Sequence, residues 1–89
     1  MIPSHRAPTH PGEILLEEFL KPKTMTQVEL AAKMGIPLNR LNELIRGKRG
    51  MTADTALRLA KALKTTPEFW MNLQMACDLH EARRAMAVA

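Results

Sequence analysis

The stretch TQVELAAKMGIPLNRLNELIRGKRG, residues 26–50, decides the fold of this 89-residue chain. Thr26 and Glu29 have the spacing of a capping box, which predicts the start of a helix, and Gly35 is a residue type that ends helices in a left-handed conformation. A second helix is predicted over about residues 38–46, only three residues after the first one ends. Two short helices separated by a tight turn are typical of a helix-turn-helix unit.

The spacing inside this stretch supports the same interpretation. If Gln27 is position one, Ala31 is fifth, Gly35 is ninth and Leu41 is fifteenth. The fifth position must be small because the two helices cross closely there, and the ninth must tolerate the sharp turn. The remaining buried positions are expected to be Leu30, Met34, Ile36 and Leu44. A plain three-helix packing unit is the alternative, but it does not require this whole pattern.

The second helix of such a unit enters the major groove of DNA, and its N-terminal residues meet base edges. Asn39 and Asn42 suit the paired donor and acceptor of adenine, and Arg40 suits guanine. Glu43 is expected either to accept from cytosine or to orient an arginine. The other basic residues are better placed for phosphates, which hold a protein in register without reading sequence. The predicted DNA-binding set is Gln27, Leu38, Asn39, Arg40, Asn42, Glu43, Arg46, Lys48 and Arg49. For any single member, a solvated surface position is the alternative.

The rest of the chain is predicted to be helical, with no strand and no repeat, so the fold class is all-α with five helices. A first helix is predicted over about residues 11–21, a fourth over 52–63 and a fifth over 66–86. Residues 1–9 are predicted to be a flexible arm, and residues 10–89 one helix-turn-helix domain. The predicted inward faces are Ile14, Leu15, Leu16, Phe19 and Leu20 in the first helix; Leu38, Leu41, Leu44 and Ile45 in the third; Ala53, Ala56, Leu57, Ala60 and Leu63 in the fourth; and Phe69, Trp70, Leu73, Ala76 and Cys77 in the fifth.

The fifth helix carries a second apolar stripe at helical spacing. Its members are Met71, Met75, Leu79, Ala82 and Met86. A monomer of this size can cover only one face of a terminal helix, so the stripe is expected to form a homodimer contact. A scattered set of residues tolerated by solvent is the alternative.

Charge and composition limit the function further. The net charge is +4, but residues 33–64 alone carry +6, which points to a polyanion partner for the middle of the chain. A solvated face with no partner is the alternative, and charge alone weighs the two about equally. The longest apolar runs are too short to cross a membrane, and a single cysteine fits a reducing compartment, so a cytoplasmic protein is expected. His5, His10 and His80 lack metal-ligand spacing, and no phosphate loop or activated nucleophile is evident. Neither an enzyme nor a metal or cofactor site is expected.

Four sequence strings resemble a known family. They are HPGEIL (residues 10–15), NELIRGKRG (42–50), TADTALRLAKAL (52–63) and TPEFWMNLQ (66–74). Together they closely resemble the HigA-type antitoxins, also called VapI-like plasmid-maintenance antidote proteins, of the phage-repressor-like (XRE) helix-turn-helix group. The resemblance covers roughly residues 8–80. It implies a lambda-repressor-like domain that acts as a dimeric antitoxin, binds a RelE-like, ribosome-associated, mRNA-cleaving toxin (HigB), and represses its own operon.

Three positions depart from the family pattern. Pro37 stands where a serine commonly caps the recognition helix, Lys64 replaces the usual glycine after the fourth helix, and Cys77 occupies a place that is often aromatic. The start of the recognition helix, and with it the direction of Asn39 and Arg40, is therefore open at this stage.

An acidic patch on the first helix is the candidate toxin site. Glu13, Glu17 and Glu18 are close together there, and an RNA-cleaving toxin is expected to be basic. The alternative is that these acids only complement the helix dipole. Two rival functions also stay open: a solitary repressor, which would lack an adjacent toxin reading frame, and a protein-binding adaptor that has lost DNA binding.

Overall fold

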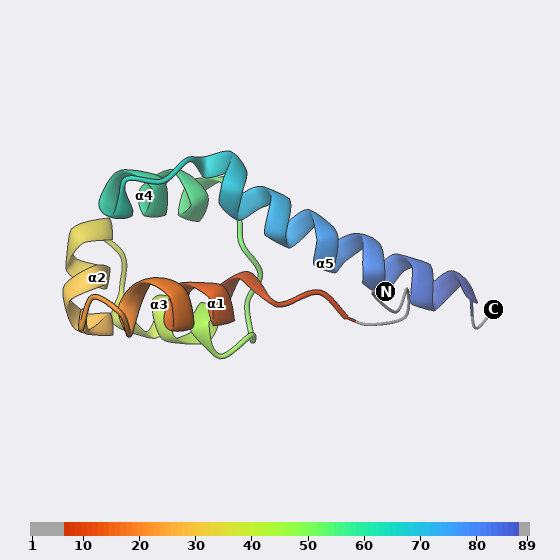
Figure 1. Ribbon diagram of the computed structural model, residues 1–89, viewed down its shortest axis with the longest axis horizontal. Helices are drawn as coiled ribbons and strands as arrows, with labels where there is room; N and C mark the ends of the chain where they lie inside the picture. Colours follow the sequence, from red (N-terminus) through yellow and green to blue (C-terminus); the bar gives the residue numbers. More distant parts are fainter. Residues whose placement is uncertain (1–6, 88–89) are drawn as a thin grey trace.

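A computed structural model describes residues 7–87, in which every regular element is a helix (Figure 1). The elements are α1 (Pro11–Ile14), the π-helix η1 (Leu15–Leu20), α2 (Gln27–Met34), α3 (Leu38–Ile45), α4 (Ala53–Leu63) and α5 (Pro67–Ala87). Because η1 continues α1 directly, the two make one helix with a wide second half. The prediction of an all-α, five-helix domain is confirmed. The part of the predicted arm that comprises residues 1–6 lies outside the described residues.

The helix ends follow local rules that the sequence makes visible. The Thr26 hydroxyl accepts from the Glu29 amide at 3.0 Å, and the Glu29 carboxylate accepts from the Thr26 amide at 2.8 Å, so the capping box is confirmed. The backbone N–H of Thr26 thereby holds the pKa of Glu29 below its usual value. Gly35 has φ +72° at the end of α2, the left-handed conformation predicted for it. Pro37 provides no side-chain cap, yet α3 still begins at Leu38.

The second half of the first helix is a π-helix, which is wider than the α-helix that the apolar pattern predicted. The amide of Lys21 donates to the carbonyl of Leu16, and the amide of Met25 donates to the carbonyl of Leu20, both at 3.0 Å. These are bonds between residues five apart, the spacing of a π-helix. Leu15 and Leu20, also five apart, are both buried. The wider turn therefore points both leucines at the core.

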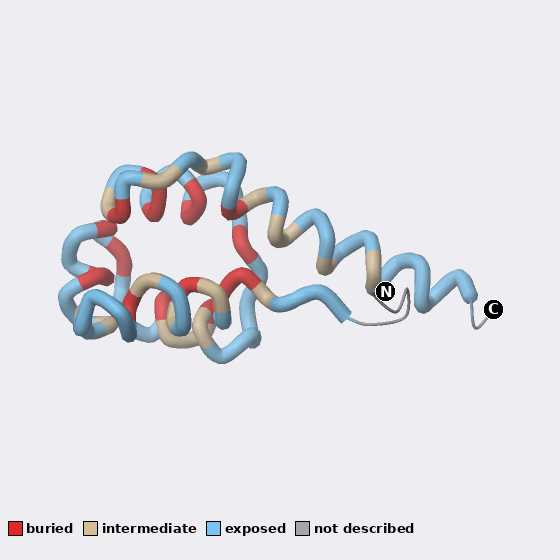
Figure 2. The backbone as a smooth tube through the Cα atoms, in the orientation of Figure 1, coloured by how far each residue is buried: buried red, intermediate tan, exposed pale blue. Residues whose placement is uncertain are grey.

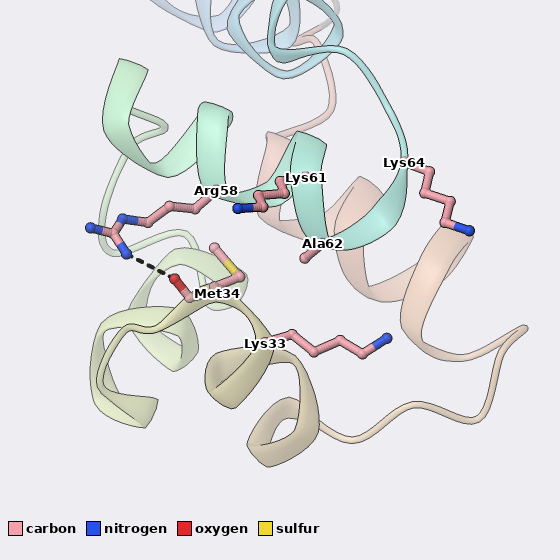
Figure 3. Close-up of a pocket in the computed structure, with 6 residues that line it drawn as sticks. All are labelled: Lys33, Met34, Arg58, Lys61, Ala62 and Lys64. Atoms are coloured by element: carbon pink, nitrogen blue, oxygen red, sulfur yellow. Dashed lines mark hydrogen bonds between the residues drawn. The ribbon is translucent and has the colours of Figure 1, made fainter.

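Two contacts hold the helix-turn-helix unit against its neighbours. A Cβ atom added to Gly12 would lie 1.9 Å from the carbonyl oxygen of Leu44, so α1 and α3 approach each other as closely as backbones allow. On the other side, Nη1 of Arg58 donates to the carbonyl oxygen of Met34 at 2.9 Å and ties α4 to the last turn of α2 (Figure 3). The position of α3 is therefore fixed from both sides.

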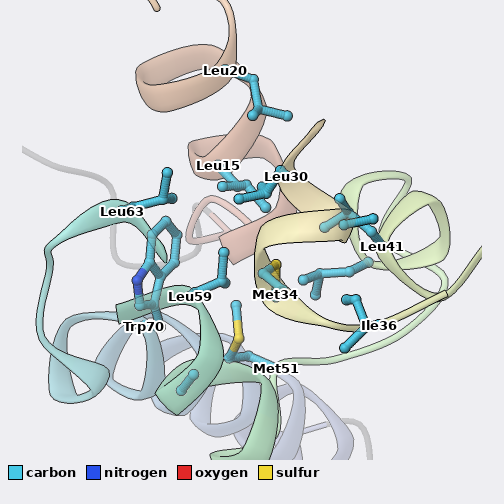
Figure 4. Packing of buried hydrophobic residues seen from close by; sticks show 13 residues of the cluster. Leu15, Leu20, Leu30, Met34, Ile36, Leu41, Met51, Leu59, Leu63 and Trp70 are labelled. Carbon is cyan, nitrogen blue, oxygen red and sulfur yellow. The ribbon is translucent and has the colours of Figure 1, made fainter. Parts of the chain in front are cut away.

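One hydrophobic cluster fills the space between the helices (Figure 4). Its buried members are Leu15, Leu20, Leu30, Ala31, Met34, Ile36, Leu41, Leu44, Met51, Ala56, Leu59, Leu63 and Trp70. In α3 and α4, three residues that the sequence predicted to face inward are exposed. Leu57 is 60% exposed and Leu38 is 46% exposed, and Ala53 is also exposed. In α4 the inward face instead includes Leu59 and the polar Thr55, which apolar patterning alone does not select.

The fifth helix leaves the core after its first turns. Trp70 is the only buried residue of α5, and the helix then projects past the other helices into solvent (Figures 1 and 2). The predicted core face is therefore only partly correct: Phe69 is 39% exposed and Ala76 is exposed, while Leu73 and Cys77 are partly buried. The second half of α5 has no cover because α5 extends beyond α4 and α1, the two helices that it contacts.

Two details complete this end of the domain. The indole N–H of Trp70 donates to the Thr65 hydroxyl at 2.8 Å, which satisfies its polar atom at the edge of the core. The thiol of Cys77 lies 3.6 Å from the carbonyl oxygen of Thr9, so the start of the described chain runs along α5. Burial raises the pKa of this thiol. No helix within residues 7–87 has the length and apolar character needed to span a membrane.

Candidate nucleic-acid interface

A shallow hollow opens where the first residues of α2 and α3 meet. It is lined by Gln27, Val28, Leu38, Asn39 and Asn42. The side-chain N–H of Asn42 donates to the amide oxygen of Gln27 at 3.1 Å, which links the two helices across their crossing. Asn39 is exposed beside this pair. The hollow therefore presents amide groups on an apolar rim, a combination that can meet both base edges and thymine methyl groups.

Four predicted members of the DNA-binding set line this hollow, and Val28 is a fifth lining residue that sequence reasoning missed. Val28 is 62% exposed although it lies in the first turn of a helix with an apolar inner face. Its position directly after Gln27 was the available signal. The exposure of Leu38 fits the same surface, since a leucine in the first turn of α3 extends the apolar rim.

Arg40 does not point outward as the guanine-reading prediction required. Its Nη2 donates to Oδ2 of Asp54 and to the hydroxyl of Thr55, both at 2.8 Å, and its side chain is only 27% exposed. The start of α4 lies beside the start of α3, so a carboxylate and a hydroxyl are within reach. Arg40 thus braces α3 against α4 in this structure, and its contact with guanine stays a prediction.

The Asp54 carboxylate is shared between two guanidinium groups. Arg58 donates to it from the next turn of α4, with Nε 3.1 Å from Oδ2. The hydrogen bond from Arg40, followed by that from Arg58, holds the pKa of Asp54 below its usual value. The carboxylate therefore stays ionised and keeps both arginines in place.

The C-terminal end of α3 supplies the basic part of the predicted set. Arg46 and Lys48 are exposed around a turn in which Gly47 has φ +76°. Arg49 is paired with Glu43, Nη2 to Oε1 at 2.8 Å, with both side chains about half exposed. Of the two predicted roles for Glu43, orienting an arginine is the one that this geometry matches.

The other predicted contact residues lie on separate surfaces. Glu13, Glu17 and Glu18 are exposed on α1 and η1, and Glu17 pairs with Lys21 at 2.8 Å. Four residues of the apolar stripe, Met75, Leu79, Ala82 and Met86, are exposed on α5. Met71 differs from the prediction because it is partly buried against the core, near the point where α5 leaves it. Within residues 7–87, no group of three or more His, Cys, Asp or Glu side chains could hold a metal ion.

The crossing of α2 and α3, the left-handed Gly35 and the outward edge of α3 define a helix-turn-helix protein. A helix-turn-helix family model matches residues 16–70. The chain is 45% identical over 75 residues to virulence-associated protein I of Dichelobacter nodosus, covering 84% of this chain and 69% of that protein. It is 46% identical over 78 residues to antitoxin HigA-1 of Vibrio cholerae, covering 88% and 73%.

A comparison with a solved structure supports the same family. The structure of the Pseudomonas aeruginosa antitoxin HigA with the higBA promoter matches with a TM-score of 0.84 at 40% identity, over 88% of this chain and 85% of that one. The chain belongs to the HigA/VapI family of helix-turn-helix proteins. The resemblance inferred from the four sequence strings is confirmed.

The bracing role of Arg40 predicts a measurable change at Asp54. In an Arg40→Ala variant the pKa of Asp54 should rise toward its ordinary value, because the first of its two guanidinium donors is gone. A side-chain carboxyl NMR titration would measure this. Because the folded-state pKa is lowered, the pairing stabilises the fold above the ordinary carboxyl pKa of about 3.9, and this stabilisation is lost as the pH falls. Arg46→Ala removes an exposed arginine of the same region and should leave the Asp54 titration unchanged; an unshifted Asp54 in Arg40→Ala would refute the bracing role.

Proposed function

We propose that this protein is a dimeric, operator-binding repressor of its own operon that also neutralises a RelE-like, mRNA-cleaving toxin of the HigB type. The observation that carries the DNA-binding part is the outward edge of α3: Asn39 is exposed, and Asn42 is held by Gln27 across the helix crossing. A relative at 40% identity, the P. aeruginosa HigA, has been solved with promoter DNA. Helix-turn-helix proteins place this edge in the major groove.

The arrangement of α3 supports a division of roles. Leu41 and Leu44 are buried, so their packing turns the amide edge outward. Base contacts are then expected from Asn39 and Asn42, which suit adenine, and apolar contact from the exposed Leu38 and Val28. The exposed Arg46 and Lys48, at the far end of α3, are expected to meet phosphates.

This division predicts different binding defects. Asn39→Ala should weaken binding to the protein's own upstream region by roughly 1–3 kcal/mol and bind an unrelated duplex almost normally, since it removes a base contact. Lys48→Ala should weaken both duplexes alike and lower the slope of log K against log salt by about 0.9, since it removes one phosphate contact. Fluorescence anisotropy with both duplexes at several salt concentrations measures the two effects. Asn72→Ala, an exposed amide on α5, is the matched control; identical defects for the Asn39 and Lys48 variants would contradict the division.

The apolar stripe of α5 is the proposed dimer contact. Met75 is 54% exposed, Leu79 is 43% exposed and Met86 is 78% exposed, and no other described helix covers the projecting half of α5 (Figure 2). A two-fold dimer would present two copies of α3 to one face of DNA. Their separation should match one turn of the duplex, about 34 Å.

A charge placed in the stripe should break the dimer. Met75→Glu combined with Leu79→Glu is expected to elute and scatter light as a monomer, because burying two carboxylates without partners is unfavourable. The same variant should lose most of its operator affinity, since each monomer reads only one half-site. Asn72→Glu, which adds a charge to α5 outside the stripe, should remain dimeric. A dimeric double variant would rule out this interface.

The acidic patch of Glu13, Glu17 and Glu18 is the proposed toxin contact. All three are exposed, on a surface separate from the hollow that α2 and α3 form. Glu13→Lys with Glu17→Lys should weaken binding of the toxin encoded beside this gene by tenfold or more, about 1.4 kcal/mol, while operator affinity holds. Glu68→Lys with Glu81→Lys makes the same charge change on α5 and should leave toxin binding intact. Unchanged toxin affinity in the patch variant would mean that these acids only complement the helix dipole.

A further inference from the structure

A second recess lies between α2 and α4, and it shares only Arg58 and Met34 with the contacts described above. It is lined by Lys33, Met34, Arg58, Lys61, Ala62 and Lys64 (Figure 3). Four of the six lining residues are cationic, and none is acidic. Figure 3 shows these side chains spread across the recess, with Arg58 and Lys61 toward one end and Lys33 and Lys64 toward the other.

Most of this positive charge is not neutralised within the described chain. Arg58 is partly balanced by Asp54. Between residues 7 and 87, no carboxylate forms a salt bridge with Lys33, Lys61 or Lys64. Glu29, one turn before Lys33 on α2, is an acid whose pKa the charge of Lys33 helps to lower. Like charges around one concave surface repel one another and raise the local potential, which favours the binding of an anion.

Lys64 adds an independent observation. Its φ is +59°, in the left-handed region, and it follows the last residue of α4 where glycine is the residue that fits without strain. Here a lysine holds that conformation and its side chain lines the recess. This left-handed residue closes α4, since the amides of Lys64 and Thr65 both donate to the carbonyl oxygen of Ala60, and it sets the lysine at the edge of the recess.

The recess faces a different direction from the DNA-reading surface. Lys33 follows Gln27 by six residues on the same helix, which amounts to a rise of about 9 Å and a rotation that leaves the two side chains about 120° apart. The recess also lies at the C-terminal end of α4, whereas Asp54, at its N-terminal end, contacts α3. DNA held by α3 therefore leaves this surface open.

The shape and lining select among anionic ligands. No aromatic ring lines the recess, so nothing there would stack on the bases of a single strand. A DNA duplex is a convex rod, whereas this is a recess between two helices whose axes pack about 8–10 Å apart. An extended polypeptide laid over the recess can reach the lysines at both ends with its carboxylates, and Met34 and Ala62 supply an apolar floor for its side-chain stems.

We propose that this recess is a docking site for an acidic polypeptide segment of a partner protein, with carboxylates spaced along it to meet the lysines at both ends. The site goes beyond the proposed operator and toxin contacts, and a segment can occupy it while DNA is bound. It gives the repressor a means of recruiting an acidic partner to its operator.

The test is binding of a fluorescein-labelled peptide of repeated Gly-Glu-Glu units to the full-length protein, followed by anisotropy. The acidic peptide should bind, and a peptide with glutamine in place of each glutamate should not. Replacing the recess lysines (Lys33→Gln, Lys61→Gln and Lys64→Gln together) should weaken binding by about tenfold or more. The matched control, Lys21→Gln, Lys23→Gln and Arg84→Gln together, removes the same charge elsewhere and should bind within about twofold of the unaltered protein.

A single-site series separates binding from stability. Lys64→Gly should raise Tm by several degrees, because the strain is relieved, and yet weaken the peptide about threefold, because one cation is lost. Lys64→Ala should weaken the peptide similarly without the gain in Tm, since alanine keeps the strained conformation.

Three results would overturn the proposal. They are absence of acidic-peptide binding, equal weakening by the recess and control triple variants, and loss of operator affinity in the recess variant. The last would assign these lysines to the DNA interface. The outcome is independent of the proposed function, because an Asn39→Ala protein with weakened operator affinity should still bind the acidic peptide.

Discussion

The inward packing of Leu41 and Leu44 is the constraint on which the rest of the structure depends. Both side chains are almost fully buried, and the carbonyl of Leu44 lies where α1 can approach only because residue 12 is glycine. Once these two leucines face the core, helical geometry places Asn39 and Asn42 on the outside. A rotation of α3 about its axis would expose the leucines and at the same time turn the amide edge away from the surface proposed to meet DNA. The packing that stabilises the core therefore also sets the direction in which Asn39 and Asn42 point.

A series of side-chain hydrogen bonds also orients α3 relative to its neighbours. Arg40 on α3 bonds to Asp54, Asp54 bonds to Arg58, and Arg58 bonds to the last carbonyl of α2. Each exposed pair alone contributes little to stability. Together, however, they connect both helices of the helix-turn-helix unit to α4 and so restrain α3 relative to it. The same Arg58 lines the basic recess. The recess is therefore connected to α3 through Arg58, Asp54 and Arg40.

Local signals in the sequence predicted most of the fold. The capping box at Thr26, the left-handed Gly35 and the small Ala31 are each decided by neighbours within a few residues, and each was predicted correctly. The pairing of Arg40 was not predicted because its partners, Asp54 and Thr55, are fourteen and fifteen residues away. A sequence pattern identifies a guanidinium that could read guanine, but it does not show that α4 begins beside it. The inward face of α4 was predicted with Leu57 in place of Leu59 for a related reason. Thr55, which is polar, takes an inward position because Arg40 donates to its hydroxyl.

The basic recess was missed because its members are far apart in sequence and each one, taken singly, looks like an ordinary surface lysine. The strained Lys64 was the one signal available, since glycine is the residue expected after the fourth helix. Its φ of +59° confirms that the position is left-handed, but only the packing of α2 against α4 shows what its side chain faces. A residue that departs from a local rule, such as Lys64, thus marks a position that merits inspection. Only the tertiary structure shows which surface its side chain lines.

The projecting half of α5 links this domain's stability to its assembly. Beyond Cys77 the helix is exposed on nearly every side up to Ala87, and its apolar residues have no cover in the described chain. An isolated helical segment of this length is only marginally stable in water, so local propensity alone does not keep it ordered. A second copy packed along the stripe would supply the missing contacts. In the proposed dimer, helicity of this segment and dimer formation would be coupled, so the fraction of protein with two paired α3 helices would rise with protein concentration. Repression by such a protein would strengthen steeply as it accumulates, because both the second half-site contact and the order of α5 appear together.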